Sequence, residues 1–271
     1  MNIIANLGKE TVRQIDQFGD FCRFSGRAFA WIPSGLSSLR NLRLAAEQLY
    51  QIGTKSILVI MITGAFVGMV LAVQVVLQFK SVGLDGHVGA IINMSVLREL
   101  GPVLAGIMLA GRVGGGLTAE LGTMRVTEQI DALRAMGSDP IRVLVVPRLI
   151  ACILMIPILV LYADFMGIWG GYIVSVHVYG VNSTDFWRFT EQSVMMFDVF
   201  FGPIKCLFFG VAMSLICCYK GFRCAPGAAG VGKACTEAFV ASAMAILCLN
   251  FFLGMLLTTI QISVWGMTPI L

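Results

Sequence analysis

Five long apolar segments constrain this chain of 271 residues more than any other feature. A helix needs about 20 predominantly apolar residues to cross the hydrocarbon core of a bilayer, where backbone groups must be satisfied within the protein. The composition, 58% hydrophobic and 13% charged, is unlike that of an ordinary soluble domain. We therefore predict an all-α integral membrane protein with spans at approximately Ser56–Phe79, Val88–Gly114, Leu149–Val176, Phe200–Cys218 and Ala238–Ile260.

The basic residues indicate how these spans are oriented. Seven Lys and Arg residues precede the first span, five lie from Arg112 to Arg148, and three lie from Lys220 to Lys233. The opposite side has Lys80 and Arg188, with Lys205 just inside the fourth span. Because Lys and Arg accumulate on the cytoplasmic side, we expect a cytoplasmic N-terminus and a C-terminus on the other side. This distribution explains the net charge of +4 without nucleic acid, since the basic residues form no run.

Residues 1–55 are predicted to form a separate segment ahead of the membrane domain, which covers residues 56–271. The segment mixes aromatic, apolar and basic residues in windows too polar to cross a bilayer. This composition favours amphipathic helices in the membrane interface, and a small soluble domain is the alternative. The opening MNIIANLGKE lacks the basic start and the long apolar stretch of a cleavable signal peptide.

The stretch APGAAGVGKA, residues 225–234, comes within one residue of a phosphate-binding loop. Gly227 to Lys233 match the pattern, but Ala234 replaces the hydroxyl residue that normally holds Mg²⁺. Such a loop also lies between a buried strand and a helix, whereas this one joins two predicted membrane helices. We therefore expect a glycine-rich turn, and no ATP or other cofactor bound by this chain.

Four cysteines lie near this loop, and we expect free thiols rather than a metal site. Their spacing is not a C-x-x-C pair and no His lies nearby, so thiols facing a reducing cytoplasm are favoured over metal ligands. The four are Cys217, Cys218, Cys224 and Cys235.

Arg98 and Glu99 lie side by side in the second span, within LRELGPVLAG. A rise of about 1.5 Å per residue from Val88 places them roughly 15 Å deep, where an ionisable residue costs about 2.5 to 3.5 kcal/mol on insertion scales. Adjacent helix residues do not face each other, so each needs another partner or water. Pro102 cannot donate to the carbonyl of Arg98, which frees an acceptor at the same depth. We predict a substrate-facing site, with a structural ion pair as the alternative.

Three further polar residues lie within predicted spans. Gln74 and Gln78 share one face of the first span, which indicates a face toward protein or water; interhelical hydrogen bonds and a cavity lining both fit. Asp164 is a lone carboxylate in the third span. We favour a structural role with a donor on a neighbouring helix over a proton relay, since a relay usually needs more titratable groups.

Glycine pairs in the first two spans have the spacing of close helix packing. These pairs are Gly64 with Gly68 and Gly111 with Gly115.

The connection between the second and third spans, MRVTEQIDALRAMGSDP, predicts a short amphipathic cytoplasmic helix. Val126, Ile130 and Leu133 recur at helical spacing, with charged residues on the other faces. Gly137 can cap this helix and Pro140 prevents its extension. The helix can serve as a handle for a soluble partner or rest on the lipid surface, and its periodicity fits both.

Several of these stretches resemble the MlaE (YrbE) permeases. The resemblance rests on GAFVGMVLAVQ, on LRELGPVLAGIMLAGRVGGGLTAELGTMRVTEQIDALRAMGSDPIRVLVVPR, on GIWGG and on GAAGVGKACTEAF. It covers about residues 56–254, and its central block is long and specific. Members of this family are membrane subunits of ABC transporters that move phospholipid or related lipid between the inner and outer membranes of bacteria.

The resemblance implies partners and site residues. It implies a homodimer in the inner membrane, a separate cytoplasmic ATPase that binds ATP and Mg²⁺, and a periplasmic MCE-domain protein above. Phospholipid would bind between the two copies, against the first two spans, with substrate-binding residues Arg98, Glu99, Gln74, Leu77 and Gln78. The segment Thr127–Met136 would be the coupling helix, with ATPase-coupling residues Thr127, Glu128, Asp131, Leu133, Arg134 and Met136.

The leading hypothesis is therefore a non-catalytic permease subunit driven by ATP hydrolysis in another chain. The alternative is a proton-coupled secondary transporter that uses Glu99 and Asp164. A membrane scaffold that transports nothing is the third hypothesis, and it predicts that neutralising the buried charges leaves function intact.

Overall fold

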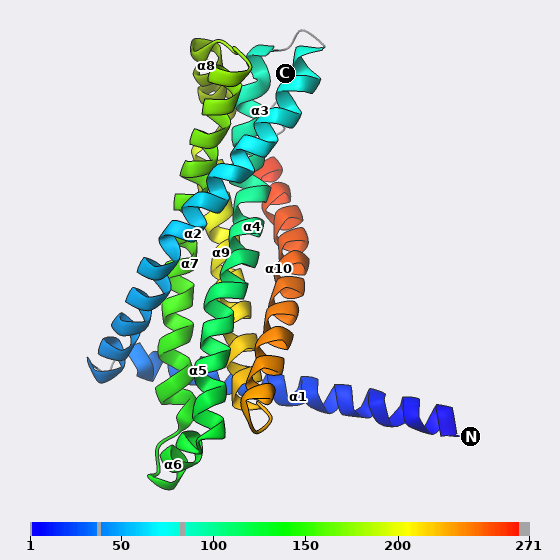
Figure 1. Ribbon diagram of the computed structural model, residues 1–271, viewed down its shortest axis with the longest axis vertical. Helices are drawn as coiled ribbons and strands as arrows, with labels where there is room; N and C mark the ends of the chain where they lie inside the picture. Colours follow the sequence, from blue (N-terminus) through cyan, green and yellow to red (C-terminus); the bar gives the residue numbers. More distant parts are fainter. Residues whose placement is uncertain (1, 37–38, 82–84, 266–271) are drawn as a thin grey trace.

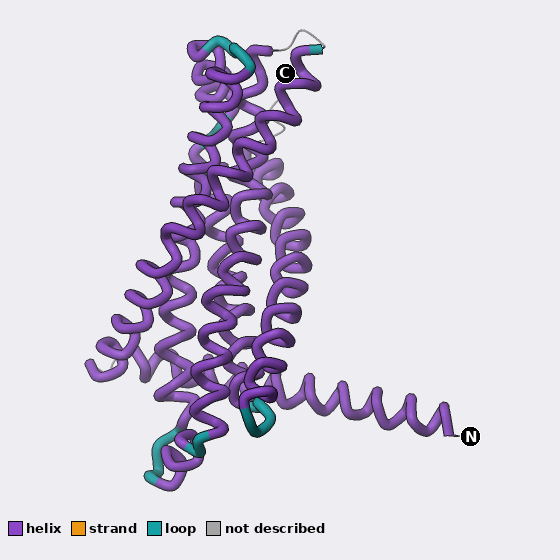
Figure 2. Tube along the Cα trace, viewed as in Figure 1, coloured by secondary structure: helices purple, strands orange, loops and turns teal. Residues whose placement is uncertain are grey.

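The structure is a computed structural model that describes residues 2–36, 39–81 and 85–265. Within these ranges the regular elements are all helical and no strand occurs. Figures 1 and 2 show long helices side by side in an elongated bundle, with one further helix extending outward from one end. The predicted all-α membrane fold is confirmed.

Five helical stretches among the described residues are long and apolar enough to cross a membrane. Each contains one predicted span and extends beyond it, because helix-forming residues continue the helix outside the apolar window. The first is α2 (Leu39–Lys80), which runs through residues 55 and 56 without a break. The second comprises α3 (Val88–Ser95), η2 (Val96–Leu100), α4 (Gly101–Leu109), η3 (Ala110–Gly114) and α5 (Gly115–Val126). The others comprise η4 (Ile141–Val145), α7 (Val146–Tyr172) and η5 (Ile173–Val178), then α9 (Met196–Phe222), then α10 (Ala228–Trp265).

The shorter helices lie at the two ends of the bundle. At one end, η1 (Asp85–His87) and α8 (Ser183–Ser193) follow α2 and η5 in the chain. At the other end lie α6 (Gln129–Ala135) and the turn between α9 and α10, and α1 (Asn2–Leu36) projects from this end. The latter end is the one where the basic residues gather, which is the expected cytoplasmic side.

Helices α2 and α7 pack most closely, through glycines. A Cβ atom added to Gly64 would overlap the backbone of Ala163, and one added to Gly68 would overlap the carbonyl oxygen of Gly167. The close helix packing predicted from the spacing of Gly64 and Gly68 is confirmed, and the helix that approaches α2 is α7. In contrast, Gly111 meets only the Phe239 ring at ordinary contact distance, and Gly115 has nothing within 4 Å.

Helix α1 carries apolar residues on two faces. Phe21, Phe24 and Ala28 pack against a core formed with the end of α9 and the start of the third span. A second stripe, Val12, Ile15, Phe18 and Phe29, is exposed. The exposed stripe is consistent with the predicted position in the membrane interface, which stays a prediction.

The near-match to a phosphate-binding loop is a turn between two helices. Helix α9 ends at Phe222, Gly227 takes a φ of +86°, and α10 begins at Ala228. Glycine is favoured there because its missing Cβ permits the left-handed backbone. Within the described residues no strand precedes this turn, so the structural context of a nucleotide-binding loop is missing.

Candidate functional site

The charged pair Arg98 and Glu99 lies in a π-helical turn, η2, in the middle of the second span. The turn ends just before Pro102, and the N–H of Gly101 bonds the carbonyl of Val96, five residues earlier. Proline has no N–H to give the carbonyl of Arg98, so the regular helix cannot continue through this point. Such π turns occur frequently at functional sites because they widen the helix and redirect side chains.

Lys205 of α9 satisfies the acceptors that this turn leaves free. Its Nζ donates to the carbonyl oxygen of Arg98 at 2.9 Å and to Oε1 of Glu99 at 2.7 Å. Asn250 of α10 completes the cluster, because its Oδ1 accepts from Lys205 at 3.1 Å and its Nδ2 donates to Oε2 of Glu99 at 2.8 Å. The Lys205 side chain is fully buried, whereas that of Glu99 is 49% exposed. The cluster therefore presents one carboxylate outward and holds it in a fixed orientation.

Arg98 points to a different partner, at the start of α9. Its Nε and Nη2 atoms lie 2.8 and 2.6 Å from Oδ1 of Asp198. The other oxygen, Oδ2, accepts from the backbone N–H of Met195 at 2.8 Å and so caps the first turn of α9. Phe201 contributes its ring face to Arg98 and Lys205, at 5.7 and 4.6 Å from the ring centroid. Arg98 is thus a structural clamp between the second and fourth spans, which is the alternative left open by its sequence.

Asp164 of α7 lies against the same turn but makes no hydrogen bond or ion pair with the described polar residues around it. A Cβ atom added to Gly101 would overlap its Oδ1, and one added to Gly202 would come within 3.4 Å of its Oδ2. The side chain is buried, and neither oxygen has a hydrogen-bond partner within the described part of the chain. The expected donor on a neighbouring helix is therefore absent among these residues, and two glycines make the room instead.

An apolar groove of about 590 Å³ runs between α2 and α4, and its lining includes Leu100, the residue that follows Glu99 in the chain. Gln74 lies in this groove, and Leu100 and Leu104 of the second span form its opposite wall. Leu77 and Gln78 lie further along α2, outside the groove lining, and both are exposed. The remaining lining residues are aliphatic or aromatic apart from Thr63: Ile62, Phe66, Val67, Val70, Leu71, Ile107 and Met108.

The predicted cytoplasmic helix is present but shorter than expected. Helix α6 covers only Gln129–Ala135, because Glu128 takes a left-handed backbone with a φ of +60° and separates it from α5. Val126 consequently belongs to the end of α5 rather than to the predicted amphipathic helix. Gly137, with a φ of +74°, ends α6 in a Schellman motif, since the N–H groups of residues 137 and 138 bond the carbonyls of residues 134 and 133.

The side chains of this segment divide into buried and exposed groups. Ile130 is fully buried and anchors α6 to the bundle, with Leu133 partly buried beside it. Asp131 pairs with Arg125 and, at 3.0 Å, with Arg134. The exposed residues of the segment are Thr127, Glu128, Gln129, Asp131, Ala132, Arg134, Ala135 and Met136. The side chain of Met136, at the end of α6, is apolar and 73% exposed.

Comparison with known proteins identifies the family. A family model described as Permease MlaE matches residues 45–256. The chain belongs to the MlaE permease family. A protein of Rickettsia felis named "Probable ABC transporter permease protein" is 42% identical over 93% of this chain and 96% of its own length. The intermembrane phospholipid transport system permease protein MlaE of Haemophilus influenzae is 36% identical over 93% of this chain and 96% of its own length.

The MlaE relatives extend beyond bacteria. The chloroplastic protein TRIGALACTOSYLDIACYLGLYCEROL 1 of Arabidopsis thaliana is 37% identical over 86% of this chain and 70% of its own length. The family match begins at residue 45, inside α2, and so leaves α1 outside it. The resemblance seen in the sequence is confirmed, and this chain is a multi-pass ABC transporter permease of the MlaE family, a class of subunit that carries no catalytic site of its own.

Sequence reasoning missed three members of the polar cluster. Lys205 was noted only for topology, and Asp198 and Asn250 were not singled out. Lys205 and Asn250 left a trace in the sequence, because a Lys or Asn inside an apolar span has the same need for a partner as Arg98 and Glu99. Asp198 left none of this kind, since it lies just before the predicted fourth span. Their pairing depends on three helices that are distant in sequence, which no spacing along one helix can reveal.

Proposed function

We propose that this chain is the membrane subunit of an ATP-driven transporter and binds phospholipid in the groove between α2 and α4. The observation that carries the proposal is the apolar groove itself, which has Gln74 in its lining and Leu100, the residue after the half-exposed Glu99, on its opposite wall. A lipid presents acyl chains and a polar headgroup. The apolar lining of the groove suits the acyl chains, and Gln74 in that lining and the exposed Glu99 beside Leu100 in the chain offer polar contacts to the headgroup.

A second copy of the chain would complete the site. In a single copy, Glu99 and Gln74 are exposed at the depth of the bilayer, where a charged or amide group facing hydrocarbon is costly. Large apolar residues along α2, such as Phe66 and Leu77, are exposed as well. A homodimer that joins the two α2–α4 faces would enclose the polar residues in a shared cavity. The name of the Haemophilus relative, a phospholipid transport permease, supports the proposal that this shared cavity holds lipid.

The energy source would be a separate cytoplasmic ATPase that binds ATP and Mg²⁺. Helix α6 lies beyond the ends of the long helices, and the residues at its two ends, Glu128 and Met136, are exposed to solvent, which suits docking of a soluble subunit. The orientation proposed from the basic residues places this end in the cytoplasm and the α8 end in the periplasm of a bacterial inner membrane. An MCE-domain protein would then meet the α8 end.

The test is to purify the tagged chain from its own membranes in mild detergent and to identify bound proteins and lipids by mass spectrometry. We expect a stoichiometric ATPase, a second copy of the chain and about one phospholipid per dimer. The variant Leu104→Trp should reduce the bound lipid by filling the groove, whereas Leu161→Trp, on the exposed face of α7, should not. A chain that emerges alone and free of lipid would contradict the proposal.

A further inference from the structure

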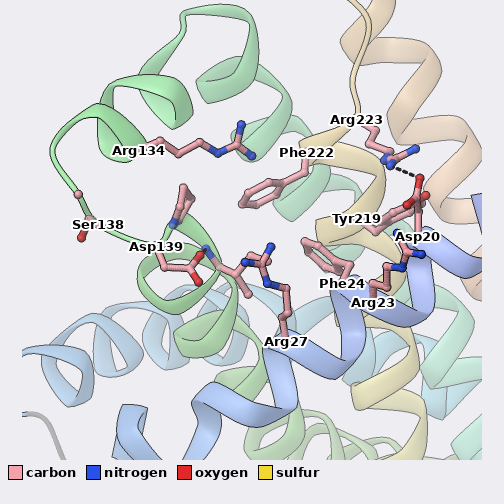
Figure 3. A pocket seen from close by; sticks show the side chains of 13 residues that line it. Asp20, Arg23, Phe24, Arg27, Arg134, Ser138, Asp139, Tyr219, Phe222 and Arg223 are labelled. Carbon is pink, nitrogen blue, oxygen red and sulfur yellow. Dashed lines mark hydrogen bonds and ion pairs between the residues drawn. The ribbon is translucent and has the colours of Figure 1, made fainter.

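A second cavity, of about 650 Å³, lies at the end of the bundle where α1 meets the loop after α6 and the end of α9 (Figure 3). It shares no residue with the groove between α2 and α4. Four arginines and two aspartates line it, together with an aromatic wall. The charged lining residues are Asp20, Arg23, Arg27, Arg134, Asp139 and Arg223.

The aromatic wall and the ends of this cavity are rigidly held. Phe24 packs edge-on against Tyr219 and Phe222, with ring centroids 5.6 Å apart in both pairs. The hydroxyl of Tyr219 donates to the carbonyl of Gln17 at 3.1 Å, which fixes α1 to α9. On the other side, the indole N–H of Trp31 donates to Oδ2 of Asp139 at 3.0 Å. The cavity is therefore preformed rather than a gap between loosely placed elements.

The charges of the cavity do not balance. Asp20 pairs with Arg223, as the dashed line in Figure 3 shows, and Asp139 accepts from Trp31 and from the backbone N–H of Ile141. Both aspartates are thus occupied.

The remaining arginines supply the surplus positive charge. Arg134 shares the single carboxylate of Asp131 with Arg125. Arg23 and Arg27, one turn apart on α1, have no hydrogen-bond or ion-pair partner among the described residues. In Figure 3 the Arg27 side chain points from α1 toward the loop that carries Asp139.

We infer that this cavity binds a phosphate ester, supplied by the headgroup of an anionic phospholipid in the cytoplasmic leaflet. Guanidinium groups match the geometry of phosphate oxygens and bind them through paired N–H donors. The exposed stripe of α1, which includes Phe18 and Phe29, would lie in the lipid and place Arg23 and Arg27 near the headgroups. The volume suits a glycerophosphate headgroup, and the fixed aromatic wall supports the arginines that face it.

This inference uses the proposed orientation but goes beyond lipid transport. The transported lipid would lie at the α2–α4 groove, whereas this headgroup would hold α1 against the loop after α6. That loop follows the segment proposed to dock the ATPase, so the lipid bound here would connect the composition of the cytoplasmic leaflet to the position of α6.

Titration of the purified full-length chain tests the inference by native mass spectrometry in detergent. The probes are dioleoyl phosphatidylglycerol, dioleoyl phosphatidylcholine, glycerol 1-phosphate and inorganic phosphate. The double variant Arg23→Gln/Arg27→Gln removes the unpartnered pair, and both residues are exposed, so the fold should be retained. The matched control Lys9→Gln/Arg13→Gln removes two charges from the same helix outside the cavity. Glu99→Gln reports on the transport groove.

We expect phosphatidylglycerol to bind more tightly than phosphatidylcholine, and the Arg23→Gln/Arg27→Gln variant to lose about tenfold or more in affinity for it. The matched control Lys9→Gln/Arg13→Gln should change that affinity by less than about threefold, since neither residue lines the cavity. Competition by glycerol 1-phosphate or inorganic phosphate at equal affinity would identify the phosphate alone as the ligand, from a soluble source.

Either of two results from the Arg23→Gln/Arg27→Gln variant would overturn the inference. One is that the variant binds all four probes with the same affinity as the unaltered chain. The other is unchanged lipid binding combined with loss of the co-purifying ATPase, which would make the cavity a protein-docking site. Loss of lipid binding only in Glu99→Gln would concern the transport groove and would count against this cavity as the anionic lipid site.

Discussion

The ammonium group of Lys205 donates a hydrogen bond, 2.9 Å long, to the backbone carbonyl of Arg98. In a regular helix that carbonyl accepts from the residue four positions later, which here is Pro102. A lysine from α9 thus replaces a backbone donor of the second span and at the same time pairs with Glu99. The break in one helix and the buried cation of another are parts of a single polar site.

Replacing Lys205 should destabilise the protein more than replacing Glu99. Lys205→Met leaves the Arg98 carbonyl without its lysine donor and leaves the Glu99 carboxylate with Asn250 alone. Breaking a fully buried ion pair costs about 3–5 kcal/mol, and the cost should be smaller here because Glu99 is half exposed. Glu99→Gln keeps an acceptor for Lys205 and should cost about 1 kcal/mol. Thermal unfolding in detergent measures both.

The double variant Glu99→Gln/Lys205→Met checks the coupling between the two residues. Because they contact each other, its loss of stability should be smaller than the sum of the two single losses. Additive losses would show that Lys205 and Glu99 act independently, contrary to the network described above.

The contact between α2 and α7 should tolerate no side chain at Gly68. A methyl group there would overlap the carbonyl oxygen of Gly167, so Gly68→Ala must separate the two helices, at about 1–3 kcal/mol. Gly115→Ala is the matched control, because a Cβ at that position meets nothing within 4 Å. The measurement is the melting temperature of each variant in detergent, and equal melting temperatures would refute the described packing.

Asp164 should be dispensable for transport. A buried carboxylate without a partner is costly when ionised, so Asp164→Asn should keep or raise the melting temperature and leave lipid transport within about twofold. Transport by the variant in reconstituted vesicles, measured at several pH values, checks this. A folded Asp164→Asn variant that no longer transports, or loses its dependence on a proton gradient, would instead favour the proton-coupled alternative.

Reversing the charge of Glu128 should weaken binding of the ATPase at α6. Glu128→Lys changes an exposed side chain that has no hydrogen-bond or ion-pair partner among the described residues, so the fold should persist while ATPase co-purification falls about tenfold or more. Asp131→Lys is less informative because it also breaks the pairs with Arg125 and Arg134. Glu191→Lys, exposed on α8 at the opposite end, is the control, and equal ATPase recovery from both would exclude α6 as the docking element.

The sequence predicted the spans because a bilayer imposes a length and a polarity on each helix separately. Ser56–Phe79 and the other four segments were found for this reason, although the helices extend further, since helix propensity does not stop at the membrane surface. Pro102 likewise predicted a free carbonyl at Arg98 from one helix alone. The late start of α6 at Gln129 was not predicted. The left-handed backbone at Glu128 causes it, and a glutamate, unlike a glycine, does not indicate such a conformation in the sequence.

The partners in the polar site could not be predicted in the same way. Lys205, Asp198 and Asn250 reach Arg98 and Glu99 from helices about 100 or more residues away in the chain, and only the packing of the bundle sets their register. The sequence left two roles open for Arg98, a substrate contact and a structural ion pair, and its pairing with Asp198 supports the structural role. Glu99, the outward-facing member, remains the better candidate for contact with substrate.

Photocrosslinking from the α2–α4 groove tests lipid binding most directly. A benzophenone amino acid replaces Leu104 inside the groove or, as the control, Phe165 on the exposed face of α7. The purified complex is irradiated after cells are grown with labelled phosphate. We predict a phospholipid adduct at position 104 that far exceeds the one at position 165 and that falls when Glu99 is replaced by Gln. Equal labelling at both positions would mean that the groove holds no specific lipid, and it would contradict the proposed function.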